Sequence, residues 1–162
     1  MRFERIFPLV VLALSSTVLF AWDATAADRF GVTVVSEAVA HAQIEKLPQA
    51  EGIALIDYAR DPNHSVLLVR RTKPGRAEVH TALTDVWYVI DGGGTLVTGG
   101  ALQNAKNTEP RELRGSGVSG GIARHIGKGD VIDIPAGVPH WVSRIYGKEL
   151  VYLTVKVAKP SQ

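Results

Sequence analysis

The chain has 162 residues and no cysteine, and its 18 basic and 16 acidic residues give a formal net charge of +2. This length predicts one domain. The absence of cysteine excludes disulfides and thiolate metal sites, so a metal has to be held by nitrogen and oxygen ligands. The positive surplus is small and no arginine-rich cluster accompanies it, so we expect no nucleic-acid partner.

Residues 1–26 have the pattern of a secretory signal peptide. Two arginines precede an apolar run over residues 6–20, and Ala-Thr-Ala at 24–26 offers the small residues that a signal peptidase accepts. The run of about 15 residues is shorter than the roughly 20 that span a bilayer. We therefore expect cleavage, no stable membrane insertion, and a periplasmic or secreted mature protein that begins near residue 27. An uncleaved N-terminal anchor is the alternative.

Helical patterning is confined to residues 36–47, and the rest of the chain is patterned as β-structure. Runs rich in Val, Ile, Leu, Tyr and Trp alternate with turn signals such as Pro74-Gly75 and Gly92-Gly93-Gly94. The expected strands span residues 53–58, 65–72, 77–82, 86–91, 94–98, 122–126, 130–134, 140–146 and 150–157. Many short strands in one small domain predict an all-β sandwich or barrel, here with a short N-terminal helical segment.

Residues 99–121 interrupt this pattern. The segment is rich in Gly, Asn, Lys, Glu and Arg and has little apolar periodicity. A loop of this length is uncommon in a compact domain and is usually functional or disordered. Its glycines could hinge a lid over a site, or the segment could be a surface excursion.

A regular spacing links Gly129, Pro135, Gly137 and His140, in the form G-x5-P-x-G-x2-H. Pro135 ends the hydrogen bonding of the preceding strand, and Gly137 supplies a tight turn. His140 then becomes the first inward side chain of the next strand. The spacing resembles the second conserved motif of the cupin superfamily, except that Arg144 stands where that motif ends in Asn.

The stretch that ends in Asp85-x6-Gly92 resembles the first cupin motif, with Asp85 in place of a Glu. Four residues separate His80 from Asp85, which puts Glu78 where the first His of the motif would stand. An alternative alignment makes His80 the first His, but it leaves only two residues before Asp85. The resemblance covers about residues 65–157. It implies a jelly-roll barrel, or double-stranded β-helix, over residues 65–160, after an extension with the first strands over 27–64.

The resemblance implies that Glu78, His80, Asp85 and His140 hold a divalent metal. Glu78 and His80 are two residues apart on a strand and therefore project to the same face. Two carboxylates and two neutral imidazoles carry a charge of −2, and their donor atoms suit Fe, Mn, Ni or Zn. Glu78 or Asp85, if not coordinated, could also act as a catalytic residue that moves a proton.

The first functional hypothesis is a metal-dependent enzyme of oxygenase, isomerase or lyase type that acts on a small polar molecule. The alternative is a non-catalytic protein that binds a small ligand in the same pocket. A barrel that has lost its metal would leave Glu78 at a solvated rim and His80 as a hydrogen-bonded core residue. Small barrels of this family often pair through their sheets, so the resemblance also implies a homodimer.

In two pairs of adjacent strand residues, the side chains must point to opposite faces of the sheet. Alternation along residues 65–72 turns one of Arg70 and Arg71 inward, where a guanidinium could clamp a carboxylate, although we expect exposure at a sheet edge. Trp87 and Tyr88 follow Asp85 on opposite faces of one strand. One of them should line the cavity while the other lies outside.

Overall fold

The computed structural model describes residues 27–47 and 52–159, and the expected signal peptide at 1–26 lies outside this part of the chain. The elements are α1 (Glu37–Lys46), β1 (Ile53–Arg60), β2 (His64–Arg71), β3 (Ala77–His80), β4 (Leu83–Thr98), β5 (Ala101–Gln103), β6 (Lys106–Glu109), β7 (Glu112–Gly115), β8 (Gly117–Ser119), β9 (Ile122–Gly127), β10 (Val131–Ile134) and β11 (His140–Ala158). Among the described helices, none has the length and apolar character needed to cross a membrane.

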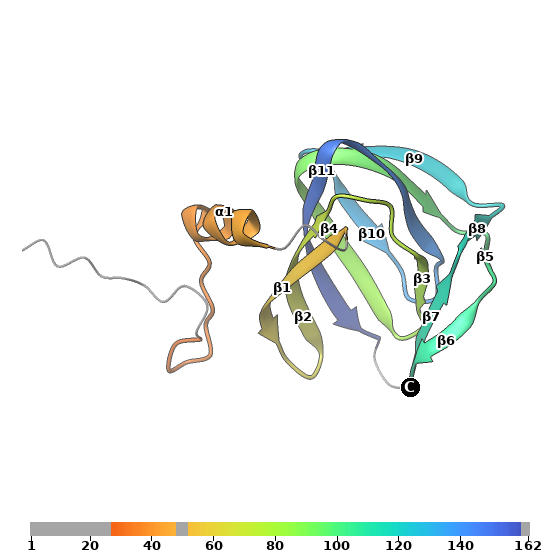
Figure 1. Ribbon diagram of the computed structural model, residues 1–162. Helices are drawn as coiled ribbons and strands as arrows, with labels where there is room; N and C mark the ends of the chain where they lie inside the picture. The colour runs from red at the N-terminus through yellow and green to blue at the C-terminus, as the bar shows by residue number, and fades with distance from the viewer. Residues whose placement is uncertain (1–26, 48–51, 160–162) are drawn as a thin grey trace, which may run out of the picture.

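Nine strands form one antiparallel sheet that curls into a half-barrel (Figure 1). The sheet order is β1-β2-β11-β3-β7-β6, while β4 pairs with β9, β10 and β11. The pairing of β4 with β11 runs from Thr98 opposite His140 to Leu83 opposite Ala158, so these two strands form the long central ladder. The predicted all-β, jelly-roll barrel class with one short helix is confirmed.

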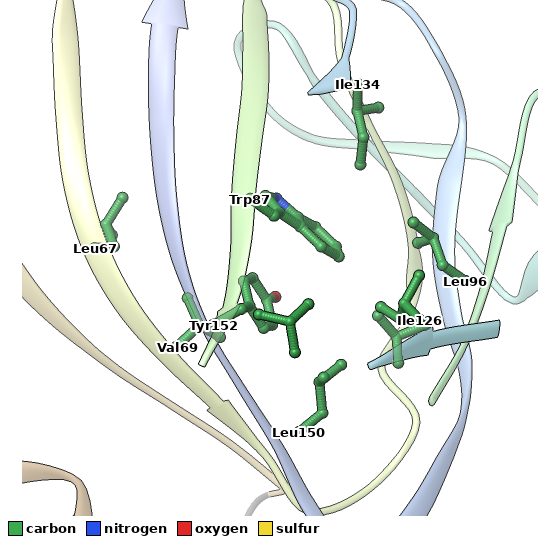
Figure 2. Packing of buried hydrophobic residues seen from close by; sticks show 10 residues of the cluster. Leu67, Val69, Trp87, Leu96, Ile126, Ile134, Leu150 and Tyr152 are labelled. Carbon is green, nitrogen blue, oxygen red and sulfur yellow. The ribbon is translucent and has the colours of Figure 1, made fainter. Parts of the chain in front are cut away.

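Alternation along the strands separates the barrel interior from its outer face. The interior holds a core of ten buried apolar residues, which are Leu67, Val69, Trp87, Val89, Leu96, Ile126, Ile134, Val142, Leu150 and Tyr152. In Figure 2, the rings of Trp87 and Tyr152 extend from adjacent strands toward Leu96, Ile126 and Ile134 on the opposite side. The two rings stack with centroids 4.3 Å apart. Trp87 is therefore the inward member of the Trp87–Tyr88 pair, and Tyr88 is exposed.

The helix packs outside the barrel wall (Figure 1). Ser36 precedes α1 as its N-cap, and its hydroxyl accepts a hydrogen bond from the Val39 amide at 3.3 Å. Ile44 is the buried residue of the helix, and it joins Tyr58, Leu68 and Val151 in a second apolar cluster on the outer face of the sheet. This cluster attaches the helix to the outer face of the sheet.

The predicted turn at Gly92–Gly94 is wrong, because β4 continues through these residues and pairs with β11 on both sides of them. The glycines instead allow two backbones to approach. Gly92 has φ of +71°, and a Cβ there would overlap the carbonyl oxygen of Glu149. The register of β11 shifts at the same level, between Tyr146 and Leu150, so this is where the long ladder bends.

The expectation of an irregular loop over residues 99–121 is also wrong. The segment forms four short strands, in which β6 pairs with β7 and β5 pairs with β8. β7 then pairs with β3 and so extends the barrel sheet. Apolar periodicity did not predict these strands, because strands of three or four residues are too short to show an alternation of apolar and polar side chains. β7 therefore lies beside β3, the strand that carries Glu78 and His80, and can contribute side chains to the same site.

Candidate metal centre

The structure brings all four side chains of the sequence-derived site together inside the barrel. Glu78 and His80 project from β3, Asp85 from the start of β4, and His140 from the start of β11, and all four are buried. His140 Nε2 lies 3.4 Å from Glu78 Oε1 and 4.0 Å from Asp85 Oδ2. His80 Nε2 lies 3.9 Å from Glu78 Oε2 and 3.5 Å from Asp85 Oδ2.

Local hydrogen bonds orient both imidazoles with Nε2 toward the interior. His140 Nδ1–H donates to the Val138 carbonyl at 3.0 Å, and His80 Nδ1–H donates to the Glu112 carboxylate at 2.6 Å. The tautomers that these partners require leave a lone pair on each Nε2. Burial lowers the pKa of His140, and burial followed by the charge of Lys156 lowers the pKa of His80. Both rings are therefore neutral at pH 7 and able to ligate a metal.

Three of the four residues form a group that could hold one metal ion. Ligand atoms of Glu78, His80 and His140 all lie within 4.8 Å of one another. His140 Nε2 is a buried nitrogen without a hydrogen-bond partner, and such an atom normally costs free energy unless something binds it. A ligand bond of about 2 Å places neighbouring donors roughly 3 Å apart, so small side-chain movements suffice. The donor set fits a divalent cation.

Two arginines surround the carboxylate of Glu78. Arg114, directly opposite Glu78 in the pairing of β3 with β7, forms an ion pair with Glu78 Oε2. Arg71 Nη2 lies 3.5 Å from Glu78 Oε1, while Arg71 Nε donates to the Tyr152 hydroxyl at 2.9 Å. Burial, and then the neighbouring charges of Arg71 and Arg76, lower the pKa of Arg114. These guanidiniums compete with a metal for the electron pairs of Glu78.

Lys156 contacts the other carboxylate and one of the histidines. Its Nζ donates to Asp85 at 2.6 and 2.8 Å and to His80 Nε2 at 2.9 Å. Asp85 Oδ2 also accepts from Trp87 Nε1 at 3.3 Å. Burial lowers the pKa of Lys156, and the charge of Asp85 opposes that change. Both oxygens of Asp85 therefore have a cationic partner in Lys156, just as both oxygens of Glu78 have partners in Arg71 and Arg114.

The two sequence segments that carry the spaced motifs meet at this point. β10 ends at Ile134, Gly137 turns with φ of +86°, and its amide donates to the His80 carbonyl at 2.9 Å. His140 then pairs directly with Glu78. The two segments that resemble the cupin motifs therefore meet inside the jelly-roll barrel, and the polar centre lies where they come together.

Comparisons with solved structures find other barrels of low sequence identity. KdgF from Halomonas sp. is 15% identical, with 70% of this chain and 86% of that chain covered at a TM-score of 0.46. TT1209 from Thermus thermophilus is 18% identical over 72% and 95% of the two chains, at a TM-score of 0.49. The Streptomyces nucleoside dehydratase PAC13 is 16% identical over 72% and 78%, at 0.47. No family model and no curated protein matches the chain.

Sequence reasoning missed three charged residues of the polar centre: Glu112, Arg114 and Lys156. Glu112 and Arg114 are opposite His80 and Glu78 in the β3–β7 pairing, and only their own two-residue spacing hinted at a shared face. Lys156 had a clearer signal. It follows Tyr152 at an interval of four residues in an alternating strand, so the two side chains share a face.

The expectation that Arg70 and Arg71 are exposed is wrong, because both side chains are buried. Arg71 faces the interior of the barrel. Arg70 faces outward, where its Nε donates to Glu149 and its Nη1 donates to the Leu47 carbonyl at 3.3 Å. These partners come from the end of α1 and from the middle of β11, and neither contact is visible in the local sequence.

A cavity of about 870 Å³ opens over this centre. Apolar residues of β1 and β2 form one side, whereas β3, β6, β7 and the loops beside them supply most of the charged lining. The charged lining residues are Arg60, Arg71, Arg76, Glu78, Asp85, Glu109, Glu112, Arg114 and Lys156. A pocket of this size accommodates a small molecule, and its wall carries one more cation than anion.

Proposed function

We propose that the protein is a metal-dependent enzyme that acts on a small polar molecule, with a divalent cation held by Glu78, His80 and His140. One observation carries the proposal. The Nε2 lone pairs of two neutral, oriented imidazoles converge with one carboxylate, and His140 Nε2 is buried without a partner. Nitrogen and carboxylate donors suit Fe, Mn, Ni or Zn.

The cation would act as a Lewis acid toward a substrate oxygen or, as iron, support oxygen chemistry. The other steps belong to residues of the chain. Asp85, the carboxylate outside the three-residue group, is placed to move a proton, with Lys156 as its hydrogen-bonded neighbour. The stacked rings of Trp87 and Tyr152 line the cavity and give it an apolar wall beside the polar centre. This arrangement is compatible with an isomerase, a lyase or an oxygenase.

The charges of the cavity favour an anionic substrate. Arg71, Arg76 and Arg114 line the same cavity, and burial, followed by the charges of Arg71 and Arg76, lowers the pKa of Arg114. A divalent cation would add to this positive field. Guanidinium groups bind carboxylates and phosphates through paired N–H donors. We therefore propose a substrate that carries a carboxylate or a phosphate, with the arginines as its orienting contacts.

Metal analysis of protein purified without a histidine tag tests the metal site. We expect one equivalent of a divalent cation per chain after incubation with Fe(II), Mn(II), Ni(II) or Zn(II) and removal of excess. The variant His140→Ala should lose at least about 90% of this cation, since one of three ligands is gone. His125→Ala is the matched control, because His125 is exposed and stacks on Tyr146. Equal metal content in the two variants would contradict the site.

A second function, binding of a small molecule without turnover, is favoured by a different observation. The carboxylates of Glu78 and Asp85 already have cationic partners in Arg71, Arg114 and Lys156. Both carboxylates are therefore already paired with cations in the absence of a metal. Incubation of a panel of carboxylates and phosphates with and without Fe(II) separates the two functions, since an enzyme consumes a compound that a binding protein only retains.

We also propose that the mature protein is exported and forms a homodimer. The signal-peptide pattern of residues 1–26 supports export, and the exposed edges of the curled sheet give a physical motive for pairing. Native mass spectrometry of the protein from an exporting host tests both points. The expected mass is that of two chains that begin near residue 27, and a full-length monomer would contradict both.

A further inference from the structure

We propose that Lys156 is an internal counter-cation that occupies the metal-facing nitrogen of His80 and thereby sets the affinity of the centre for divalent metals. The inference rests on the proposed metal site and adds a determinant of its affinity. The structural basis is a three-way contact in which one ammonium joins His80 Nε2 and both oxygens of Asp85.

The register of the sheet places Lys156 in this position. It stands directly opposite Asp85 in the pairing of β11 with β4, and opposite Ser65 in the pairing with β2. Tyr152 and Thr154, which precede it at intervals of two residues, are also on the inner face and line the same cavity. The backbone therefore places the lysine side chain inside the barrel, where its ammonium contacts both Asp85 and His80.

The contact with His80 excludes simultaneous metal coordination by that ring. The unprotonated nitrogen of a neutral imidazole has a single in-plane lone pair, which accepts a hydrogen bond or binds a metal but not both. His80 Nδ1 is held by Glu112 at 2.6 Å, so the ring has no other nitrogen to offer. A metal bound by Glu78, His80 and His140 must first displace Lys156 from His80 Nε2.

Displacement does not require Lys156 to leave Asp85. The ammonium lies 2.6 Å from Asp85 Oδ2, and this ion pair survives a small rotation of the lysine stem away from His80. The ammonium would still lie close to the metal and repel it. Removing Lys156 would therefore free His80 Nε2, release Asp85 as a further ligand, and remove a positive charge, and all three effects strengthen metal binding.

The test compares Zn(II) and Co(II) affinities of the wild type, Lys156→Met and Arg76→Met, measured by competition with a chelating dye. We expect Lys156→Met to lower the Kd about tenfold or more. Arg76→Met is the control for charge alone. Arg76 also lines the cavity, but no contact joins it to His80 or Asp85 among the described residues. We expect it to change the Kd by less than about threefold.

A second variant and a second readout keep the test decisive if Lys156→Met folds poorly. Lys156→Gln keeps a polar side chain without the charge and should also tighten binding. The visible spectrum of bound Co(II) should lose intensity in both Lys156 variants relative to the wild type, because a released Asp85 raises the coordination number.

The outcomes separate the two proposals. Tighter binding by the Lys156 variants than by Arg76→Met supports the inference, as does binding that appears only when Lys156 is replaced. Equal affinities of the wild type and the Lys156 variants overturn the inference and leave the metal site in place. Failure of every variant to bind a divalent cation overturns the metal site and the inference together.

Discussion

The variant Asp85→Asn is expected to lose about 3 kcal/mol of its free energy of unfolding, measured in a chelating buffer so that metal binding does not contribute. Asp85 is 2% exposed, and its carboxylate neutralises the ammonium of Lys156. Breaking a buried ion pair by removing one charge typically costs about 3–5 kcal/mol, because the other charge is left without a partner. The lower value applies here since Asn still accepts hydrogen bonds from Lys156 and Trp87.

A double-mutant cycle with Lys156→Met separates this ion pair from other effects. The double variant removes both charges, so its loss of stability should be smaller than the sum of the two single losses by about 1–3 kcal/mol. Urea denaturation followed by circular dichroism supplies the four free energies. Additive losses would show that Asp85 and Lys156 do not depend on each other.

The variant Trp87→Ala is expected to destabilise the barrel by about 3–5 kcal/mol, the usual cost of truncating a buried aromatic side chain. Trp87 is 1% exposed and stacks on Tyr152 between the apolar core and the polar centre. Its removal would leave a cavity beneath Asp85 and His140. Thermal and urea denaturation should show lower midpoints for the variant.

Tyr88→Ala is the matched control, because Tyr88 is the next residue of β4 and points outward with 49% of its surface exposed. Exposed substitutions of this kind usually change stability by less than about 1 kcal/mol. Similar losses for Trp87→Ala and Tyr88→Ala would mean that the inner and outer faces of β4 are assigned incorrectly.

Local sequence patterns were enough to predict the outline of the barrel and part of its centre. Apolar runs bounded by turn residues predicted most of the strands. The alternation of side chains within such runs follows from the backbone geometry of β-structure. The spacing from Gly129 to His140 identified a strand end, a tight turn and an inward imidazole, and the structure has all three. These features are local, so a few neighbouring residues are enough to specify them.

The charges that surround the imidazoles depend on strand pairings between distant parts of the chain. Glu112 and Arg114 reach the centre because β7 pairs with β3. Residues 99–121 have no apolar periodicity from which this pairing could be predicted. Lys156 stands at the far end of the strand that begins with His140, yet both side chains approach Asp85. They meet because the long β4–β11 ladder bends and closes on itself, and such closure depends on the packing of the whole sheet.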